Sequence, residues 1–360
     1  MSSAETVFLT GFPGFIAGRL IERLAEGGAR FLLLVQPALM PRAAEEVARI
    51  AARHELEPSR FTLLEGDITL PDLGLEAQKL ALARRETTTL FHLAAIYDLA
   101  VARAVALRIN LEGTRRVNDF VRSLPRLARY HYVSTCYVAG KRTGLIRENE
   151  LRHEAGFRNY YEETKYLAEL EVEALKKDVP LTIHRPSVVC GDSRTGETVK
   201  YDGIYYLIHY LRSWPQLLTH INIGNRDVSL NIVPVDFVIK AMAALARDER
   251  AAGATVQLAD PAPLTTHELF EVIAHSLAGH GSRLTVPAPL VRSSLMLPVS
   301  PPITGLPFAA VPYFFLSQTY DTTGAERLLA PHGVRCPPFG EYVGNLIDFI
   351  NREESALARQ

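Results

Sequence analysis

Residues 10–18 read TGFPGFIAG, and this stretch decides the fold. It follows a short apolar run, Val7–Leu9, and leads directly into a helical pattern. A glycine-rich turn between a strand and a helix offers free backbone N–H groups and the positive end of the helix dipole, which together favour a phosphate. In such a turn, Gly11 allows a tight bend, Gly14 allows a pyrophosphate to approach, and Ala17 allows close helix–strand packing. We therefore expect a dinucleotide to contact Thr10, Gly11, Phe12, Pro13, Gly14, Phe15 and Ile16.

Outward from this turn, short apolar runs alternate with helical patterns as far as residue 190. Continuous apolar runs are typical of parallel strands that are buried on both faces. We expect strands at Val7–Leu9, Phe31–Val35, Phe61–Leu64, Thr89–Leu93, Tyr130–Ser134 and Leu181–Val189. Helical patterns cover Ala43–His54, Leu75–Arg85, Ile109–Leu124 and Tyr161–Lys176. The alternation predicts an α/β fold with a Rossmann-type, doubly wound parallel sheet.

The pattern changes after Cys190. Residues 191–224 are rich in aromatic side chains and are expected to form mostly loops. A strand at Val228–Val233, a helix from about Pro234 to Ala246 and a strand at Thr255–Leu258 follow. We therefore predict a dinucleotide-binding domain made of residues 1–190 and about 225–260. A smaller, discontinuous substrate domain is predicted from about 191–224 and 261–360.

Composition excludes several classes of protein. The chain has 360 residues and a net charge of -1, so it has neither the polarity of a disordered chain nor a general attraction for nucleic acid. Its three cysteines are far apart, which favours a reducing compartment, and neither a metal site nor a signal peptide is recognisable. We therefore expect a cytoplasmic protein.

Residues 293–320 contain no charged side chain but are interrupted by five prolines. Such a segment is a poor membrane-spanning helix. It is interpreted either as packed loop and short helix, or as a wall for an apolar substrate, or as a surface that makes peripheral contact with a membrane.

The end of the second expected strand bears on the choice of nucleotide. It reads Val35-Gln36-Pro37, without the acidic residue that binds ribose hydroxyls in NAD-dependent proteins. This favours NADP, with NAD as the alternative. Arg19 and Arg42 are candidates to bind a 2′-phosphate, and Gln36 lies where the ribose is expected. Asp67 is either a contact to the adenine amine or an ordinary turn aspartate.

A tyrosine phenol can protonate a carbonyl oxygen, and a lysine one helical turn away can lower the pKa of that phenol. Two segments have the Tyr-x-x-x-Lys spacing, Tyr137–Lys141 and Tyr161–Lys165. We prefer the second because Tyr161 begins a helical pattern, whereas Tyr137 follows a strand and precedes a glycine. Before this helix, Ser134 and Thr135 place two hydroxyls at the carboxyl end of a strand, where ligands bind in open α/β sheets.

The motifs TGFPGFIAG (10–18), GD (66–67), FHLAA (91–95), NLEGT (110–114), VSTCYVAG (133–140), YEETK (161–165) and HRPSVV (184–189) occur in an order that resembles the extended short-chain dehydrogenases/reductases. The resemblance covers about residues 5–260. It implies a catalytic group of Thr135, Tyr161 and Lys165, with Lys165 also contacting the nicotinamide ribose. It also implies cofactor contacts at Ile68, Ala94, Ala95, Ser134, Pro186, Ser187 and Val188.

Within that family, FHLAAIYDL (91–99), GDSRTGET (191–198) and NIVPVDFV (231–238) look most like the thioester and fatty acyl-CoA reductase (male-sterility-like) branch. The resemblance implies an NADPH-dependent reductase of an apolar carbonyl or acyl thioester, with a small-molecule substrate and a homodimer as a further expectation. The alternatives are a hydroxysteroid- or flavonol-type dehydrogenase, a nucleotide-sugar epimerase or dehydratase, and a non-catalytic NADP sensor.

Overall fold

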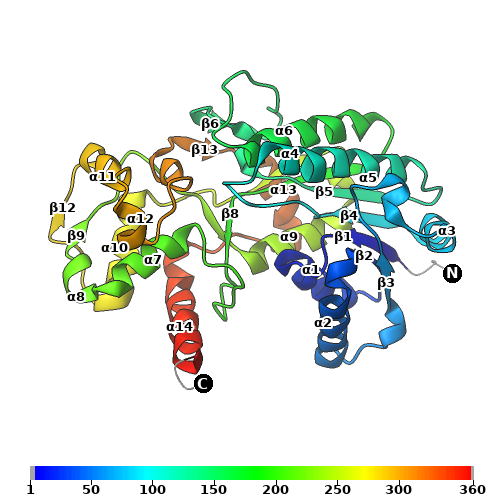
Figure 1. The fold of residues 1–360 in the computed structure, drawn as a ribbon, viewed down its shortest axis with the longest axis horizontal. Helices are drawn as coiled ribbons and strands as arrows, with labels where there is room; N and C mark the ends of the chain where they lie inside the picture. The colour runs from blue at the N-terminus through cyan, green and yellow to red at the C-terminus, as the bar shows by residue number, and fades with distance from the viewer. Residues whose placement is uncertain (1–4, 358–360) are drawn as a thin grey trace.

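The computed structural model describes residues 5–357 and contains a seven-stranded parallel sheet in the order β11-β7-β5-β4-β1-β2-β3 (Figure 1). Its strands are β1 (Thr6–Thr10), β2 (Arg30–Val35), β3 (Phe61–Glu65), β4 (Thr89–His92), β5 (Arg129–Val133), β7 (Leu181–Pro186) and β11 (Thr255–Leu258). Every neighbouring pair in this sheet is parallel. The predicted doubly wound α/β fold is therefore confirmed.

Helices cover both faces of the sheet because each strand is apolar on both sides. On one face lie α1 (Phe15–Ala25), α2 (Met40–Arg53), α9 (Val235–Ala246) and α13 (Thr323–Leu329). On the other face lie α3 (Ala77–Glu86), α5 (Gly113–Arg122) and α6 (Tyr160–Glu173). Alternate residues of one strand serve the two cores: Val7 and Leu9 face α1, whereas Phe8 packs on Phe120 of α5.

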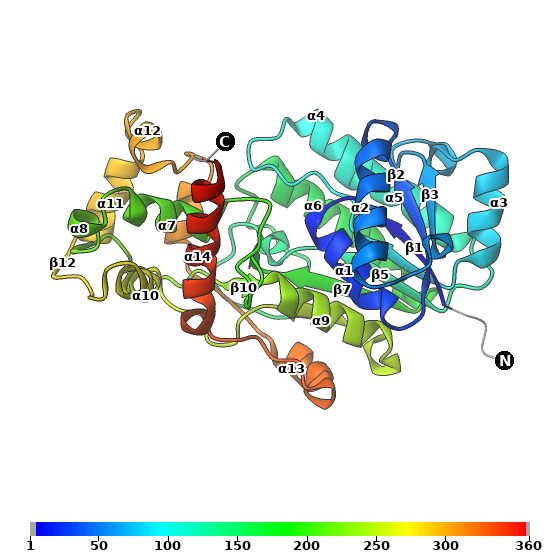
Figure 2. The ribbon, with the colours of Figure 1, turned by 90° about the horizontal axis from the view of Figure 1, so that it is seen from below.

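A smaller lobe stands beside the carboxyl edge of the sheet (Figure 2). Its helices are α7 (Ile204–Ser213), α8 (Pro215–Leu218), α10 (Thr266–Ala278), α11 (Ala288–Leu295), α12 (Ser300–Thr304) and α14 (Phe339–Leu357). The apolar faces of α7, α10 and α14 form a core of their own, with Ile208, Phe270 and Leu346 fully buried. In residues 5–357, no helix combines the length and the apolar character needed to cross a bilayer.

Short elements complete the chain. Three two-stranded parallel pairs are formed by β8 (Val188–Cys190) with β10 (Ile232–Pro234), β9 (Ile221–Asn222) with β12 (Leu284–Thr285), and β6 (Gly144–Ile146) with β13 (Gln318–Tyr320). A short helix, α4 (Arg103–Ala106), leads into a π-helical segment, η4 (Leu107–Glu112). The 3₁₀ turns are η1 (Pro37–Leu39), η2 (Pro58–Arg60), η3 (Pro71–Gly74), η5 (Cys136–Ala139), η6 (Ala174–Lys177), η7 (Glu249–Ala251), η8 (Val311–Phe315) and η9 (Ala330–His332).

For the second half of the chain, one strand prediction was wrong and one loop prediction was incomplete. The single strand expected at Leu181–Val189 is divided at Ser187 into β7 of the main sheet and β8, which pairs with β10. Pro186 has no N–H to continue the ladder, so the chain changes partner there. The loops expected at 191–224 contain the ten-residue helix α7, whose buried residues lie at helical spacing despite its many aromatic side chains.

The domain boundaries stay a prediction. The position of helix α13 is relevant to them. Helix α13 lies in the region predicted for the substrate domain, but Ala325 and Leu329 are buried in the sheet core against α9 and β11.

Buried histidines in the sheet predict a loss of stability in acid. Burial lowers the pKa of His184 to about 3 and holds that of His131 well below its usual value, and the rings are joined by a 3.1 Å hydrogen bond. Because the unfolded chain binds protons below about pH 6.5 and these rings do not, stability falls as pH drops from there toward 3. At pH 5, the pKa shift of His184 accounts for about 2 kcal/mol, and His131 acts in the same direction. Urea unfolding of wild type and His184→Gln at pH 7 and pH 5 checks this, and an equal pH-dependent loss in both proteins contradicts it.

Candidate active site

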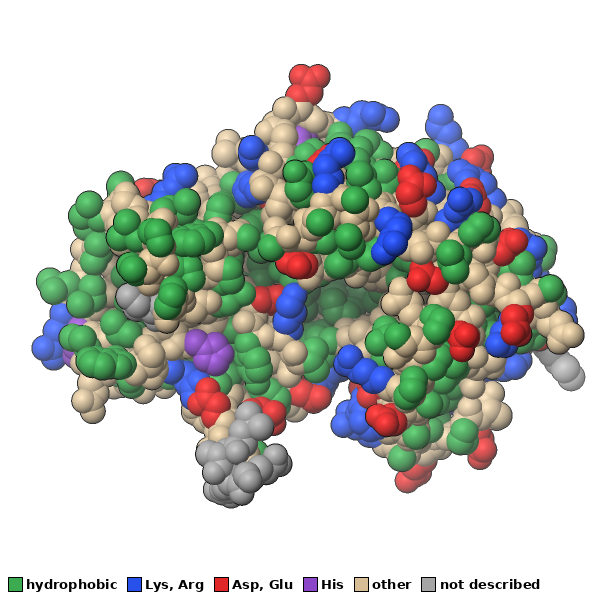
Figure 3. Space-filling view, in the orientation of Figure 1, with side chains coloured by type: hydrophobic (Ala, Val, Ile, Leu, Met, Phe, Trp, Pro, Cys, Tyr) green, Lys and Arg blue, Asp and Glu red, His purple; other side chains and the backbone are tan. Residues whose placement is uncertain are grey.

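A cavity of about 700 Å³ lies at the carboxyl ends of the strands, where the sheet meets the smaller lobe. Figure 3 shows this face of the molecule hollowed between the two parts. The cavity brings together most of the predicted site residues: Thr10, Gly11, Phe12, Pro13, Gly14, Phe15, Ile16, Gln36, Arg42, Ile68, Ala94, Ala95, Ser134, Thr135, Tyr161, Lys165, Pro186, Ser187 and Val188. Arg19 and Asp67 are not among its lining residues.

The glycine-rich turn leaves a hollow that side chains at its glycine positions would fill. Gly11 has a φ of +94°, and a Cβ there would lie 2.8 Å from the backbone nitrogen of Ala94. A Cβ on Gly14 would lie 2.7 Å from the carbonyl oxygen of Gly11, so this glycine is required by the turn itself. The N-terminus of α1 follows at once and opens onto the cavity. The turn therefore fits the pyrophosphate of a dinucleotide.

A buried chain of hydrogen bonds fixes this turn to β4 and α5. The Ala94 N–H donates to Thr10 Oγ1, which leaves the Thr10 hydroxyl to donate to His92 Nδ1 at 2.7 Å. His92 Nε2 then donates to Thr114 Oγ1, and that hydroxyl donates to the Asn110 carbonyl. Burial lowers the pKa of His92 to about 3, which keeps the ring neutral as this arrangement requires. Sequence reasoning missed His92, although the motif containing it was recognised.

Thr135, Tyr161 and Lys165 meet at one end of the cavity. Tyr161 and Lys165 lie one turn apart on α6, while Thr135 follows β5 and its side chain hydrogen-bonds that of Tyr161. The ammonium of Lys165 donates to Tyr132 Oη at 2.9 Å and to the Val133 carbonyl at 2.8 Å. All three predicted catalytic side chains are buried and line the same cavity.

Burial has the largest effect on the pKa values of both Tyr161 and Lys165. Burial raises the pKa of Tyr161, opposed by the hydrogen bond to Thr135. Burial also lowers the pKa of Lys165 to about 7, opposed by the Glu169 carboxylate. The Lys165 ammonium is directed toward β5, where it donates to Tyr132 and to the Val133 carbonyl. A raised pKa keeps the phenol protonated at neutral pH, the state that a proton donor needs.

The two adjacent hydroxyls have different partners. Ser134 lines the cavity, but its hydroxyl donates to Glu169 and is therefore already engaged. Glu169 also accepts from Arg185 at 2.5 Å, and both of these charged side chains are buried. Thr135 is left as the hydroxyl beside Tyr161. Glu169 lies one turn beyond Lys165 on α6, and sequence reasoning missed this carboxylate and its partner.

The alternative Tyr137–Lys141 pair does not form a second group of this kind. Tyr137 lies in the 3₁₀ turn η5, and its ring packs on Tyr313 at 4.6 Å. Lys141 is exposed and lies outside the lining of the cavity. The structure therefore distinguishes two segments that have the same spacing in the sequence.

The loop after β4 and the loop before α7 form the outer wall of the cavity. Tyr97 packs edge-on against the Tyr161 ring at 5.0 Å. Lys200 donates to the Tyr97 carbonyl at 3.3 Å and pairs with Asp202 at 3.0 Å. The contact joins two segments about 100 residues apart, which no local sequence pattern signals.

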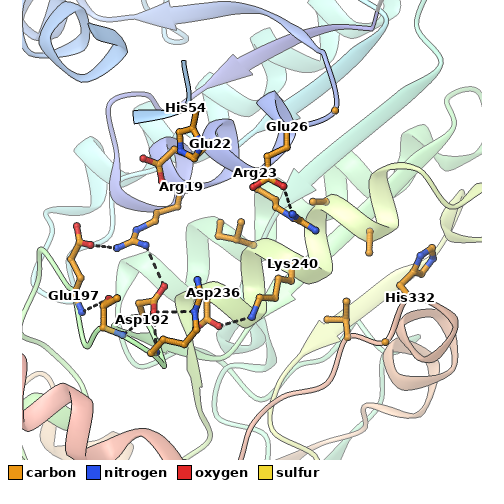
Figure 4. Close-up of a pocket in the computed structure, with 18 of the residues that line it drawn as sticks. Arg19, Glu22, Arg23, Glu26, His54, Asp192, Glu197, Asp236, Lys240 and His332 are labelled. Atoms are coloured by element: carbon orange, nitrogen blue, oxygen red, sulfur yellow. Dashed lines mark hydrogen bonds and ion pairs between the residues drawn. The ribbon is translucent and has the colours of Figure 1, made fainter. Parts of the chain in front are cut away.

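Arg19 was predicted to bind a 2′-phosphate, but its guanidinium is engaged elsewhere. It pairs with Asp192 at 3.3 Å and with Glu197 at 2.6 Å (Figure 4). These contacts lie in a separate polar cleft between α1, α9 and the loop after β8. Asp67 accepts a hydrogen bond from the Gln36 amide at 3.1 Å and from the Thr69 N–H at 2.8 Å.

Arg42 lies in the first turn of α2 and lines the cavity, so it remains the candidate for a 2′-phosphate. We expect Arg42→Ala to raise the Kd for NADPH about tenfold or more at low salt, because a charge-assisted hydrogen bond is lost. NADH lacks the phosphate, so its Kd should change less than about twofold. Arg19→Ala is the matched control and should leave both constants unchanged. Parallel weakening of NADPH and NADH binding in Arg42→Ala contradicts this assignment.

The family comparison agrees with this geometry. The model of the male sterility protein family, an NAD-binding family, matches residues 9–242. The chain belongs to this family. The sequence-based prediction of an extended short-chain dehydrogenase/reductase of the thioester reductase-like branch is thereby confirmed, as are its oxidoreductase class and its nicotinamide cofactor.

Individual relatives are distant. Fatty acyl-CoA reductase wat of Drosophila melanogaster is 26% identical over an alignment of 282 positions, and this alignment covers 67% of this chain and 54% of that protein. Glycine betaine reductase ATRR of Emericella nidulans is 24% identical over an alignment of 289 positions, and this alignment covers 75% of this chain and 22% of that protein. The chain thus spans about half or less of the length of these two curated relatives.

Among solved structures, the terminal R domain from the myxalamid PKS-NRPS biosynthetic pathway superposes with a TM-score of 0.82 at 23% identity. The match covers 98% of this chain and 92% of that one. The shared fold therefore includes the smaller lobe as well as the sheet.

Proposed function

We propose that this member of the male sterility protein family is an NADPH-dependent reductase of an apolar acyl thioester or the corresponding aldehyde. The observation that carries the proposal is the position of Thr135, Tyr161 and Lys165 in the same cavity as the glycine-rich turn. The names of the relatives, a fatty acyl-CoA reductase and a glycine betaine reductase, support reduction at the carboxyl level.

The residues of the cavity would hold the cofactor along the strand ends. Gly11 and Gly14 leave room for the pyrophosphate, and Pro186 and Ser187 are placed for the nicotinamide end. The boundaries predicted for a cofactor domain, 1–190 and about 225–260, are part of this proposal. When bound, the reduced nicotinamide supplies a hydride to the carbonyl carbon of the substrate.

Side chains of the protein bind the carbonyl oxygen of the substrate and protonate it. Thr135 holds the carbonyl oxygen by a hydrogen bond, and Tyr161 donates its phenolic proton to that oxygen as negative charge develops. The product of this step is a hemithioacetal, which breaks its C–S bond to give an aldehyde and a thiol. Lys165 donates hydrogen bonds to Tyr132 and to the Val133 carbonyl of β5, and these contacts fix the side chains next to the phenol.

A substrate panel tests the proposal. Oxidation of NADPH is measured with dodecanoyl-CoA, dodecanal, a steroid ketone and a nucleotide sugar at matched concentrations. The proposal expects turnover of dodecanoyl-CoA or dodecanal at least about tenfold above the other two compounds. Faster turnover of the ketone or the nucleotide sugar overturns it in favour of a different branch of the family.

A further inference from the structure

The loop after β8 separates the catalytic cavity from the polar cleft shown in Figure 4. The cleft has a volume of about 1120 Å³, and none of the described residues that line it takes part in the proposed chemistry. The loop lines the cleft with Asp192, Arg194, Thr195 and Glu197, and it lines the catalytic cavity with Thr198, Val199, Lys200 and Asp202. A contact that fixes this loop in the cleft therefore also fixes one wall of the catalytic cavity.

Arg19 makes such a contact by reaching from α1 across the cleft to this loop. Its guanidinium donates to Asp192 Oδ2 at 3.3 Å and pairs with Glu197 Oε2 at 2.6 Å, and Figure 4 draws both contacts. The guanidinium also lies 5.5 Å from the ring centre of Phe15, which lines the catalytic cavity. Asp192 is only 2% exposed, and the exposed Arg194 approaches it no closer than 4.0 Å. Arg19 is therefore the main counter-charge of a buried carboxylate.

The two sides of this contact differ in how firmly the rest of the protein holds them. Helix α1 is packed into the core of the sheet, where Leu20 and its apolar neighbours are fully buried. The segment 196–202 lacks such packing over part of its length, because Val199 is 61% exposed and Lys200 is exposed as well. Loss of the Arg19 side chain would therefore leave α1 in place and free the segment.

Short contacts connect this segment to the proton donor. The Lys200 ammonium lies 4.0 Å from the centre of the Tyr97 ring and donates to the Tyr97 carbonyl at 3.3 Å. The Tyr97 ring in turn packs edge-on against the ring of Tyr161 at 5.0 Å. The chain of contacts from Arg19 through Glu197, Lys200 and Tyr97 therefore ends beside the catalytic phenol.

We propose that Arg19 is a positioning residue that holds segment 196–202 against the catalytic cavity, and that it sets the affinity for the substrate but not for the cofactor. The inference adds a residue to the proposed function and rests on that function for its kinetic consequence. A wall that leaves its place lowers the apparent affinity for the substrate, since only molecules with the wall in place bind it. Arg19 does not line the catalytic cavity, so the binding of NADPH at the glycine-rich turn stays unchanged.

Hydrogen exchange tests the structural half of the proposal without any substrate. Backbone amide exchange is followed by mass spectrometry in wild type, Arg19→Met and Arg23→Met. Arg23 is the matched control, because it lies on the same helix and lines the same cleft but pairs with Glu26. In Arg19→Met, the amides of 196–202 should exchange about tenfold faster, because a lost charge-assisted hydrogen bond is worth about that factor. Exchange in 15–25 should not change, and Arg23→Met should match wild type in both segments.

Two results of this experiment overturn the proposal. One is the same exchange at 196–202 in wild type and Arg19→Met. The other is faster exchange in 196–202 and 15–25 alike, because Arg19 would then stabilise the fold as a whole. If Arg19→Met does not fold, Glu197→Gln replaces it. That pair is partly exposed, so exchange at 196–202 should rise only about threefold, and no rise overturns the proposal.

Kinetics test the functional half of the proposal. In Arg19→Met, KM for dodecanoyl-CoA or dodecanal should rise at least about threefold, while kcat and the Kd for NADPH stay within about twofold of wild type. Arg19→Lys keeps the positive charge and should recover part of the lost affinity for the substrate. A smaller fraction of folded enzyme would instead lower kcat and leave KM unchanged, and that result overturns the proposal. If wild type reduces neither compound, the proposed function fails, while exchange at 196–202 still decides whether Arg19 holds the wall.

Discussion

Tyr161→Phe is expected to lower kcat for thioester or aldehyde reduction by about 10²- to 10⁴-fold, the usual worth of a positioned proton donor. The change removes only the phenolic oxygen, whereas the ring keeps its contacts with Tyr97 and the surrounding apolar cluster. The Kd for NADPH should therefore stay within about twofold of wild type. Steady-state kinetics and fluorescence titration with NADPH check the two parts.

Tyr137→Phe is the matched control for this prediction. Tyr137 lines the same cavity and has the same spacing to a lysine, but that lysine is exposed. We expect Tyr137→Phe to change kcat less than about threefold. A large loss in Tyr137→Phe together with an active Tyr161→Phe enzyme would assign the proton donor to the other tyrosine.

Glu169→Gln is expected to lower the free energy of unfolding by about 3–5 kcal/mol, because it leaves the buried guanidinium of Arg185 without its counter-charge. The amide oxygen can still accept from Arg185 while the amide NH2 donates to Ser134 Oγ, so the shape of the side chain and its hydrogen-bonded neighbours are kept and the effect reports mainly the charge. Loss of this carboxylate also removes the group that raises the pKa of Lys165. The pKa of Lys165 should therefore move further below its usual value. Urea unfolding at pH 7 measures the stability change.

Two further variants keep this prediction specific. Glu163→Gln lies on the same helix, where its exposed pair with Arg103 should contribute less than about 1 kcal/mol. Glu169→Leu combined with Arg185→Met replaces both charges by apolar groups, and should recover much of the stability lost in Glu169→Gln. If the double variant is as unstable as Glu169→Gln, the loss comes from packing and not from an unpaired charge.

The parts of the site that sequence alone predicted are those governed by local geometry. The turn at 10–18 needs glycine because a Cβ at Gly11 or Gly14 would meet backbone atoms, and that requirement is visible as a motif. The spacing of Tyr161 and Lys165 similarly follows from one helical turn. The alternation of apolar runs with helical patterns was enough to predict the parallel sheet.

The parts that could not be predicted depend on residues far apart in the chain. Arg19 lies within the dinucleotide motif, yet acids more than 170 residues away hold its side chain in another cleft. The direction in which the pKa of Tyr161 is shifted could likewise not be predicted, because it depends on how deeply the folded chain buries the phenol. The division of the expected strand at Ser187 could not be predicted either, because β8 pairs with β10, which lies more than 40 residues further along the chain.

The central claim is that a hydride from the nicotinamide reaches the carbonyl carbon of an apolar substrate in the cavity of Tyr161. The most direct measurement is to incubate the protein with dodecanoyl-CoA and NADPH deuterated at both C4 positions, and to analyse the products by mass spectrometry. Our account predicts dodecanal or dodecanol with deuterium on the former carbonyl carbon, and none with Tyr161→Phe over the same time. Bound NADPH with no deuterated product from either dodecanoyl-CoA or dodecanal would contradict it.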